Sequence, residues 1–489
     1  MSKGISHQES SPRSSGCSYV TTTAGLIVAI IVLLGTIAAA GTVYSQDEFV
    51  ALAIGGASSH ITTTGTDVIF VDNSETDDSF RVRAVNASSG KQQWQIEQEG
   101  WAEFGGVASG TLALFVGRFD RLIAIQTRSG EIDWTETFLG WRGMIGANAS
   151  SFFFIQDQDV VALDAQSGTE TWRFGGGEFP LVDYQPAAGL VGRNLVVAGG
   201  DGRAVVAIDP DTGTLRWTFP CENGAFAAAA ALLASLAISD STSVYGVDSA
   251  SGDRLWTLRT PGGNELLGSG GGMVFAARGP ETPSLLDDPL HQSEIVAVDG
   301  TTGAVLWQFP AAELAADTVL RVTRHAVFDR NTLYVSTFGN QNLFSPEASE
   351  GDWLYALDAA TGIERWRTEI PVPSHLVAVT QGIVLVSNAG QGVFMEDVLA
   401  RIVAYDALTG EEQWSVRPGG IFSGEIHVKG EHVYALSGVE VDELRSFNLE
   451  SGQNDWSQDF GLPWPAWMTF VGLSLIISFL IVAVRTRFS

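Results

Sequence analysis

Six aspartates recur at one fixed place in a repeated phrase and are the residues of this chain best suited to chemistry. Each stands four residues before a glycine and eight before a tryptophan; they are Asp164, Asp209, Asp248, Asp299, Asp358 and Asp406. A carboxylate can ligate calcium or take up a proton during catalysis. Each aspartate also follows a β-branched run and begins a turn, where its oxygens can accept backbone N–H groups. We therefore interpret the six as turn caps and expect no catalytic residue and no metal ligand among them.

The remaining reactive side chains form no motif of catalysis or metal binding. The two cysteines, Cys17 and Cys221, belong to neither a CxxC nor a CxxCH motif. The seven histidines are scattered, and only His427 and His432 lie close in sequence. Their odd separation would put them on opposite faces of a single strand. A GxSxG nucleophile signature is absent from the sequence.

The whole phrase occurs nine times and predicts a repeated strand–turn–strand unit. Its pairs of glycine and tryptophan are Gly90 and Trp94, Gly130 and Trp134, Gly168 and Trp172, Gly213 and Trp217, Gly252 and Trp256, Gly303 and Trp307, Gly362 and Trp366, Gly410 and Trp414, and Gly452 and Trp456. The glycine can adopt a positive φ, and the tryptophan begins the returning strand. Asn86, Gln126 and Asn448 replace the aspartate in three units; asparagine still caps a turn, and glutamine does so less well.

Two further strand-like runs precede each phrase, such as residues 144–148 and 151–156. A unit therefore has about four short strands and roughly 40 residues, which is typical of a β-propeller blade. A solenoid would need parallel strands and a much shorter period.

The consensus A-x-D-x-x-T-G-x-x-x-W resembles the tryptophan-docking repeat of the pyrroloquinoline-quinone (PQQ) propellers, over about residues 55–460. The resemblance implies an all-β ring of four-stranded antiparallel blades, with each tryptophan wedged between neighbouring blades. Propellers of this family usually have eight blades. We expect eight here, with one of the nine units incomplete or outside the ring, and keep nine blades as the alternative.

The family that the repeat resembles contains both enzymes and scaffolds. Its quinoprotein dehydrogenases hold PQQ and Ca²⁺ near the axis, and the alcohol type carries adjacent cysteines that this chain lacks. Its propeller lipoprotein of the bacterial outer-membrane assembly machine has no cofactor and acts as a scaffold. Because the recurrent aspartates already have a role in turns, we expect a non-catalytic protein-binding or assembly scaffold without a cofactor. The alternative is a PQQ-dependent quinoprotein dehydrogenase of the membrane.

The charge of the chain excludes nucleic acid as a partner. Acidic residues number 56 and basic residues 27, for a net charge of −29. Such a surface repels phosphates. The lysines are only Lys3, Lys91 and Lys429. A composition with many acidic residues and few lysines also looks like that of proteins from salt-loving archaea, in which concentrated salt screens the repulsion between carboxylates. An ordinary acidic surface is the alternative.

Two apolar segments, residues 24–43 and 464–484, predict membrane anchors at both ends of the chain. Each is long enough to cross roughly 30 Å of hydrocarbon as a helix. Basic residues flank them toward the chain ends, so tails 1–23 and 485–489 should be cytoplasmic. The propeller, residues 50–460, should then lie outside the cell, at the cell membrane. A cleaved signal peptide is the alternative for the first segment.

Two N-A-S sequons begin at Asn86 and Asn148 and are candidate glycan acceptors outside the cell. Asn86 is also a turn cap, which favours Asn148 of the two.

Three consecutive units carry long insertions between their second and third strands, at residues 279–294, 338–352 and 388–400. Equivalent loops of successive blades emerge on one face of a propeller, and long loops on a rigid frame often carry recognition residues. We expect a protein partner on this long-loop face. Insertion tolerated at the surface without a function is the alternative.

Overall fold

The computed structural model describes residues 61–460, apart from short connections between strands and five longer segments, at 176–188, 279–293, 310–320, 339–351 and 389–399. All of the described residues belong to the second of two compact units, residues 57–489. In this described part, 36 strands form nine four-stranded sheets, which we number as blades 1 to 9 in chain order.

Each blade consists of four strands that follow one another in sequence. Blades 1 to 3 contain β1 (Ile61–Thr64), β2 (Asp67–Ser74), β3 (Ser79–Asn86), β4 (Gln92–Glu99), β5 (Ala102–Ala108), β6 (Thr111–Val116), β7 (Arg121–Gln126), β8 (Ile132–Thr137), β9 (Trp141–Ala147), β10 (Ser151–Gln156), β11 (Asp159–Asp164) and β12 (Glu170–Phe174). Blades 4 to 6 contain β13 (Gly189–Val191), β14 (Asn194–Gly199), β15 (Ala204–Ile208), β16 (Leu215–Pro220), β17 (Ala228–Ala231), β18 (Ser235–Ser239), β19 (Ser243–Asp248), β20 (Arg254–Arg259), β21 (Asn264–Gly270), β22 (Met273–Arg278), β23 (Glu294–Asp299) and β24 (Val305–Phe309). Blades 7 to 9 contain β25 (Arg321–Asp329), β26 (Thr332–Phe338), β27 (Asp352–Asp358), β28 (Glu364–Ile370), β29 (His375–Thr380), β30 (Ile383–Asn388), β31 (Arg401–Asp406), β32 (Glu412–Val416), β33 (Phe422–Lys429), β34 (His432–Ser437), β35 (Glu443–Asn448) and β36 (Asn454–Asp459).

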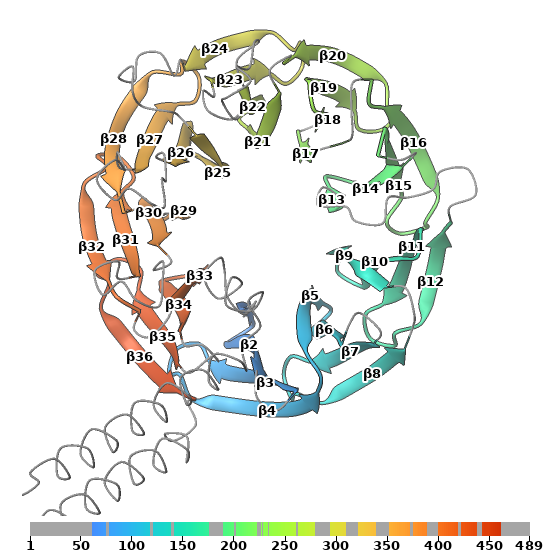
Figure 1. The fold of residues 1–489 in the computed structure, drawn as a ribbon, viewed down its shortest axis with the longest axis vertical. Helices are drawn as coiled ribbons and strands as arrows, with labels where there is room; N and C mark the ends of the chain where they lie inside the picture. Colours follow the sequence, from blue (N-terminus) through green and yellow to red (C-terminus); the bar gives the residue numbers. More distant parts are fainter. Residues whose placement is uncertain are drawn as a thin grey trace, which may run out of the picture. The chain divides into compact units, whose positions relative to one another are not determined.

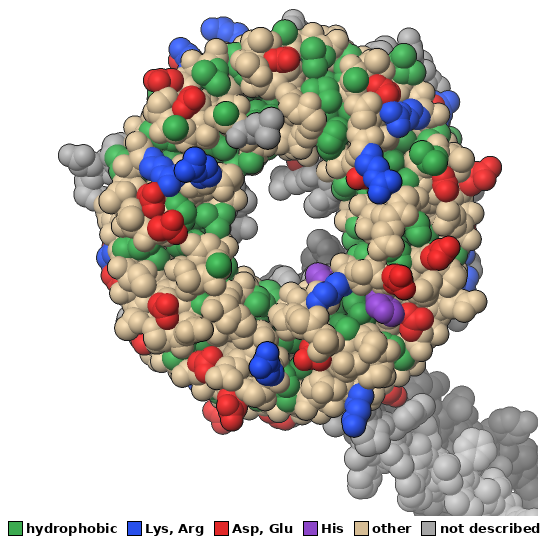
Figure 2. Space-filling model, turned by 180° about the vertical axis from the view of Figure 1, so that it is seen from behind, with side chains coloured by type: hydrophobic (Ala, Val, Ile, Leu, Met, Phe, Trp, Pro, Cys, Tyr) green, Lys and Arg blue, Asp and Glu red, His purple; other side chains and the backbone are tan. Residues whose placement is uncertain are grey.

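The blades form a ring that is open along its axis (Figures 1 and 2). In every blade the first strand lies nearest the axis and the fourth strand forms the outer rim (Figure 1). Because consecutive strands are antiparallel, the first–second and third–fourth turns share one face of the ring, which we call the turn face. The second–third connections and the links between blades share the other, which we call the loop face.

Burial explains why the middle strands of each blade read as apolar runs. The second strand of blade 2, β6 (TLALFV), is buried along its whole length, because blades pack against both of its faces. The fourth strand of the same blade, β8 (IDWTET), is largely exposed and buries only its tryptophan. The same contrast separates β18 from β20 in blade 5.

The hydrophobic core is divided into nine layers, one between each pair of neighbouring blades in the described ring. The layer that closes the ring joins Val68, Phe70 and Val85 of blade 1 to Tyr434 and Leu436 of blade 9, with Leu444 beside them. All nine repeat units therefore stand inside the ring as complete blades. The expectation of eight blades is wrong, and the nine-bladed alternative is confirmed.

Among the described residues, no helix is long and apolar enough to span a membrane. The two segments for which we predict membrane helices, residues 24–43 and 464–484, lie outside the described residues.

Candidate functional site

Each of the nine repeat tryptophans is docked against the following blade. Its indole N–H donates a hydrogen bond of 2.7–3.1 Å to the backbone oxygen of the residue that follows the turn cap in that blade. The last of these bonds runs from Trp456 to Ala87 and closes the ring. The chain thus uses one local device for all nine joints.

The repeat glycines lie directly under these indole groups. All nine have φ between +67° and +77°, a region that glycine adopts without steric cost. A Cβ added to any of them would lie 2.4–2.7 Å from a side-chain atom of the docked tryptophan. The glycine is therefore required twice, for the backbone conformation of the turn and for the close approach of the indole.

The six repeat aspartates cap the turns between the third and fourth strands. The Oδ1 atom of each accepts the backbone N–H groups of the second and third residues that follow it, at 2.7–3.2 Å. Asn448 makes the same two bonds, at 3.2 and 3.0 Å. Asn86 accepts the N–H group of Ser89 at 3.1 Å. Gln126 instead donates to Asp133 and accepts the hydroxyl of Ser129.

The pKa values of all six aspartates lie below the ordinary value of 3.8. The largest cause at Asp209 is a hydrogen bond from the guanidinium of Arg216, which helps to lower this pKa to about 2. The guanidinium of Arg365 likewise lowers the pKa of Asp358. These carboxylates are ionised and held by the turns, so they are poor proton acceptors near neutral pH.

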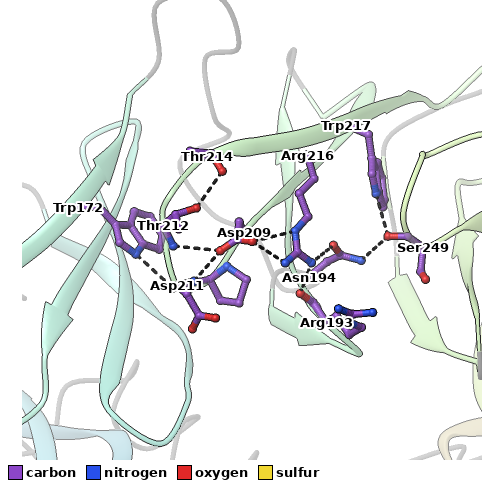
Figure 3. A network of polar contacts seen from close by, with 11 residues as sticks. Trp172, Arg193, Asn194, Asp209, Asp211, Thr212, Thr214, Arg216, Trp217 and Ser249 are labelled. Carbon is purple, nitrogen blue, oxygen red and sulfur yellow. Dashed lines mark hydrogen bonds and ion pairs between the residues drawn. The ribbon is translucent and has the colours of Figure 1, made fainter.

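At some of the contacts between blades, a second side chain donates a hydrogen bond to the backbone oxygen that accepts the indole N–H group. These side chains lie outside the repeat phrase, and the sequence analysis did not predict them. Asn194 donates to the same Ser249 oxygen that accepts the indole of Trp217 (Figure 3). Arg216 connects Asn194 to Asp209, so the hairpin turn, the capped turn and the next blade form one network. Tyr334 and Tyr434 supply an equivalent second donor, to Ala407 and Ala87. Such donors come from the first–second hairpin, outside the repeated phrase.

A small residue lies opposite each tryptophan. It belongs to the repeat phrase, but the sequence analysis assigned it no role. Each tryptophan pairs across the third and fourth strands with an alanine, glycine or serine, and a β-bulge follows at once in every blade. A Cβ on Gly246, for example, would lie 2.1 Å from the ring of Trp256. The bulge increases the local twist and turns the indole toward the next blade.

The turn face carries a groove of about 460 Å³ across blades 7, 8 and 9. Its walls include Arg330, Arg365, Asp406, Glu431 and Glu450. Leu408, which is 81% exposed, also lines it. Much of this charge is already paired within the blades, because Arg365 binds Asp358 at 2.7 Å and Asp406 caps its own turn.

On the loop face, blades 6, 7 and 8 differ from the other six blades in the length of their second–third connections. The second and third strands are joined by residues 279–293 in blade 6, 339–351 in blade 7 and 389–400 in blade 8. In the other six blades the equivalent connections have two to five residues. The long connections therefore leave three consecutive blades on one face, and almost all of their residues lie outside the described part.

The remaining candidate residues are dispersed. His427 lies on β33, with Nε2 3.0 Å from Oγ1 of Thr63 in blade 1, and His432 lies on β34, with Nδ1 2.9 Å from Oδ2 of Asp455. Cys221 is a buried free thiol. Within the described ranges, no three His, Cys, Asp or Glu side chains gather closely enough to hold a metal ion.

Comparison with known proteins supports the fold. A family model described as outer membrane protein assembly factor BamB matches residues 78–174, 156–355 and 350–466. No curated protein matches the sequence. BamB from Moraxella catarrhalis is 16% identical, with 69% of this chain and 91% of that chain covered and a TM-score of 0.43. The quinohemoprotein alcohol dehydrogenase ADHIIG from Pseudomonas putida HK5 is also 16% identical, with coverage of 77% and 69% and a TM-score of 0.44.

Because both TM-scores are below 0.5, we infer nothing about this chain from the two solved structures. The family model, in contrast, spans most of the sequence, and its matched region contains all but the first two strands of the ring. The chain therefore belongs to the PQQ-like β-propeller family whose model is described as outer membrane protein assembly factor BamB.

Proposed function

We propose that the protein is a non-catalytic scaffold that binds a protein partner through the loop face of its propeller. The observation that carries this proposal is the concentration of long second–third connections in blades 6, 7 and 8, which share one face of the ring, whereas the second–third connections of the other six blades have two to five residues. Long connections on a rigid frame are common positions for recognition residues. The family description as an assembly factor supports the same function.

The frame suits this function because its joints are so regular. Nine equivalent indole contacts hold the blades, and each buries apolar residues from both partners. Blades 6, 7 and 8 therefore hold the strand ends at 278, 338 and 388 at fixed positions relative to one another. The partner would meet three connections that are presented together, without the cost of ordering the frame on binding.

The location completes the proposal. The apolar segments 24–43 and 464–484 would anchor the chain in the cell membrane, with the propeller outside. The net charge of −29 would keep the propeller soluble in the concentrated salt of a haloarchaeal environment. Protease accessibility of the propeller in intact cells tests this location, and protection of the propeller would contradict it.

Replacement of residues 340–350 by a short Gly-Ser linker tests the partner site. We expect the variant to unfold at the same temperature as the wild type and to lose a partner that co-purifies from native membranes after cross-linking. Equivalent replacements of 280–292 and 390–399 extend the test to blades 6 and 8. Leu408→Ser on the turn face is the matched control and should retain the partner. Retention of the partner in all three linker variants would show that the connections are tolerated insertions.

The same preparation tests the dehydrogenase alternative. After addition of PQQ and Ca²⁺, we expect no alcohol-dependent reduction of an artificial electron acceptor. Turnover under these conditions would overturn the assignment as a non-catalytic scaffold.

A further inference from the structure

The two N-A-S sequons both lie in hairpin turns of the turn face. Asn86 is in the turn between β3 and β4 of blade 1, and Asn148 is in the turn between β9 and β10 of blade 3. We propose that both asparagines carry N-linked glycans, so that blades 1 to 3 present a glycosylated arc on the turn face. The inference rests on the exterior location that we propose above.

The hydrogen bonds of the two side chains leave the reactive atom available. Oδ1 of Asn148 accepts the N–H groups of Ser150 and Ser151 at 2.9 and 2.8 Å. Oδ1 of Asn86 accepts the N–H group of Ser89 and the hydroxyl of Ser88 at 3.1 and 2.8 Å. In the described structure, the Nδ2 atom of neither asparagine makes a hydrogen bond. A glycan on Nδ2 therefore keeps every turn bond that Oδ1 makes.

The surroundings of both sequons are open. Ser88 and Ser89 are exposed beside Asn86, and Ala149 and Ser150 are exposed beside Asn148. Each asparagine is itself half-buried, with its backbone held in the turn. An attached sugar would extend from the turn face into solvent, away from the loop face to which we assign the partner.

The reaction is a group transfer without oxidation or reduction. The donor class is an oligosaccharide linked through its C1 atom to a lipid phosphate or pyrophosphate. Nδ2 attacks C1, the N–C1 bond forms, the C1–O bond to the phosphate breaks, and the amide nitrogen loses one proton. The lipid phosphate leaves with the electron pair of the broken bond.

Substitution of the asparagine by aspartate should remove the glycan and keep the turn. Asp caps six of the nine repeat turns through the same oxygen, so Asn86→Asp should keep the fold of its turn. Gln is unsuitable, because Gln126 at the equivalent position does not accept the backbone N–H groups. Asn448→Asp is the matched control, since Asn448 caps the equivalent turn of blade 9 without a sequon.

The test is mass spectrometry of the full chain from native membranes, intact and as peptides. We expect a glycan on each of the two asparagine peptides, loss of one glycan in Asn86→Asp and in Asn148→Asp, and no glycan change in Asn448→Asp. An unmodified peptide at either site overturns the assignment of that site. Protease accessibility of the propeller in intact cells is measured in parallel, so that absent glycans on an accessible propeller contradict this inference alone.

Discussion

Trp456 of the last blade covers Gly90 of the first, and its indole N–H donates to the oxygen of Ala87 at 3.0 Å. The contact joins residues 369 positions apart in sequence, yet its geometry matches the eight joints between consecutive blades. Tyr434 adds a second hydrogen bond to Ala87, and Thr63 meets His427 across the same interface. The ring is therefore closed by the repeat device itself, with the ends of the described ring side by side (Figure 1).

We predict that Gly90→Ala lowers the free energy of unfolding more than another Gly→Ala substitution in blade 1, because it disturbs the joint that closes the ring. A Cβ at Gly90 would lie 2.4 Å from the indole of Trp456, at a backbone φ of +68°. The left-handed backbone alone costs an alanine about 1–2 kcal/mol. Displacement of a packed indole should bring the total to roughly 3 kcal/mol or more. Urea unfolding followed by tryptophan fluorescence measures the loss.

Gly65→Ala is the control for that prediction. Gly65 also has a positive φ, +56°, but no atom lies within 4 Å of the position of its Cβ. It should show the backbone cost without the displaced indole. Equal losses in the two variants would mean that the contact between Gly90 and Trp456 contributes nothing to stability.

The parts of the fold that depend on local contacts could be predicted from the sequence. Asp164 accepts the N–H groups of Gln166 and Ser167 at its side chain and that of Gly168 at its backbone oxygen, so its turn closes within four residues and its spacing is visible in one phrase. The strand and turn assignments follow from such spacings, whereas the antiparallel blade and the docking of the tryptophan against the next blade were implied by the resemblance to the PQQ propellers.

The number of blades could not be predicted in this way. It depends on the angle between neighbouring blades and on whether Trp456 reaches Gly90, and no single phrase records either property. The usual number in the family pointed to eight. The reinforcing donors Asn194 and Tyr334 were missed for a related reason, since they lie in hairpins that differ from blade to blade. The repeat specifies the frame alone, so the partner and the glycans that we propose rest on the long connections and on the two sequons instead.

Replacement of Gln126 by asparagine should stabilise blade 2. The shorter amide would accept the N–H groups of Arg128 and Ser129, as Asn448 accepts those of Glu450 and Ser451. The substitution gives up an exposed hydrogen bond to Asp133, and Asn avoids the second carboxylate that Asp would place there. We expect a gain of about 0.5–1 kcal/mol in the free energy of unfolding.

The reciprocal substitution, Asn448→Gln, should lose a similar amount. Both changes are measured as shifts of the urea midpoint at constant slope. If Gln126→Asn left the midpoint unchanged while Asn448→Gln lowered it, the missing cap in the turn of blade 2 would not reduce the stability of the protein.

Cys221 should react with thiol reagents only when the ring opens. It is 6% exposed, and burial, with a smaller contribution from Asp240, raises its pKa to about 12. In a Cys17→Ser background, we expect alkylation with iodoacetamide near pH 8 to be slower than that of a free thiol by on the order of a thousandfold. Denaturant should remove the difference. A Ser88→Cys variant that also lacks both native cysteines supplies the exposed reference, and comparable rates would contradict the buried position.

Acid should destabilise the propeller between about pH 4 and pH 2. The pKa of Asp209 is lowered from 3.8 to about 2, chiefly by Arg216, and the other five aspartate caps are lowered as well. In this window the unfolded chain binds more protons than the folded chain, so the stability that these caps contribute is present above the unfolded pKa and is lost as the pH falls through the folded pKa. Asp209→Asn keeps an acceptor for the turn and removes one titrating group, so the free energy of unfolding of this variant should fall less steeply as the pH is lowered.

Arg216→Met is the control: it should raise the pKa of Asp209 toward 3.8, as followed by NMR of the carboxyl carbon. An unchanged pKa in that variant would mean that the guanidinium does not hold the carboxylate, and that the turn N–H groups alone set its titration.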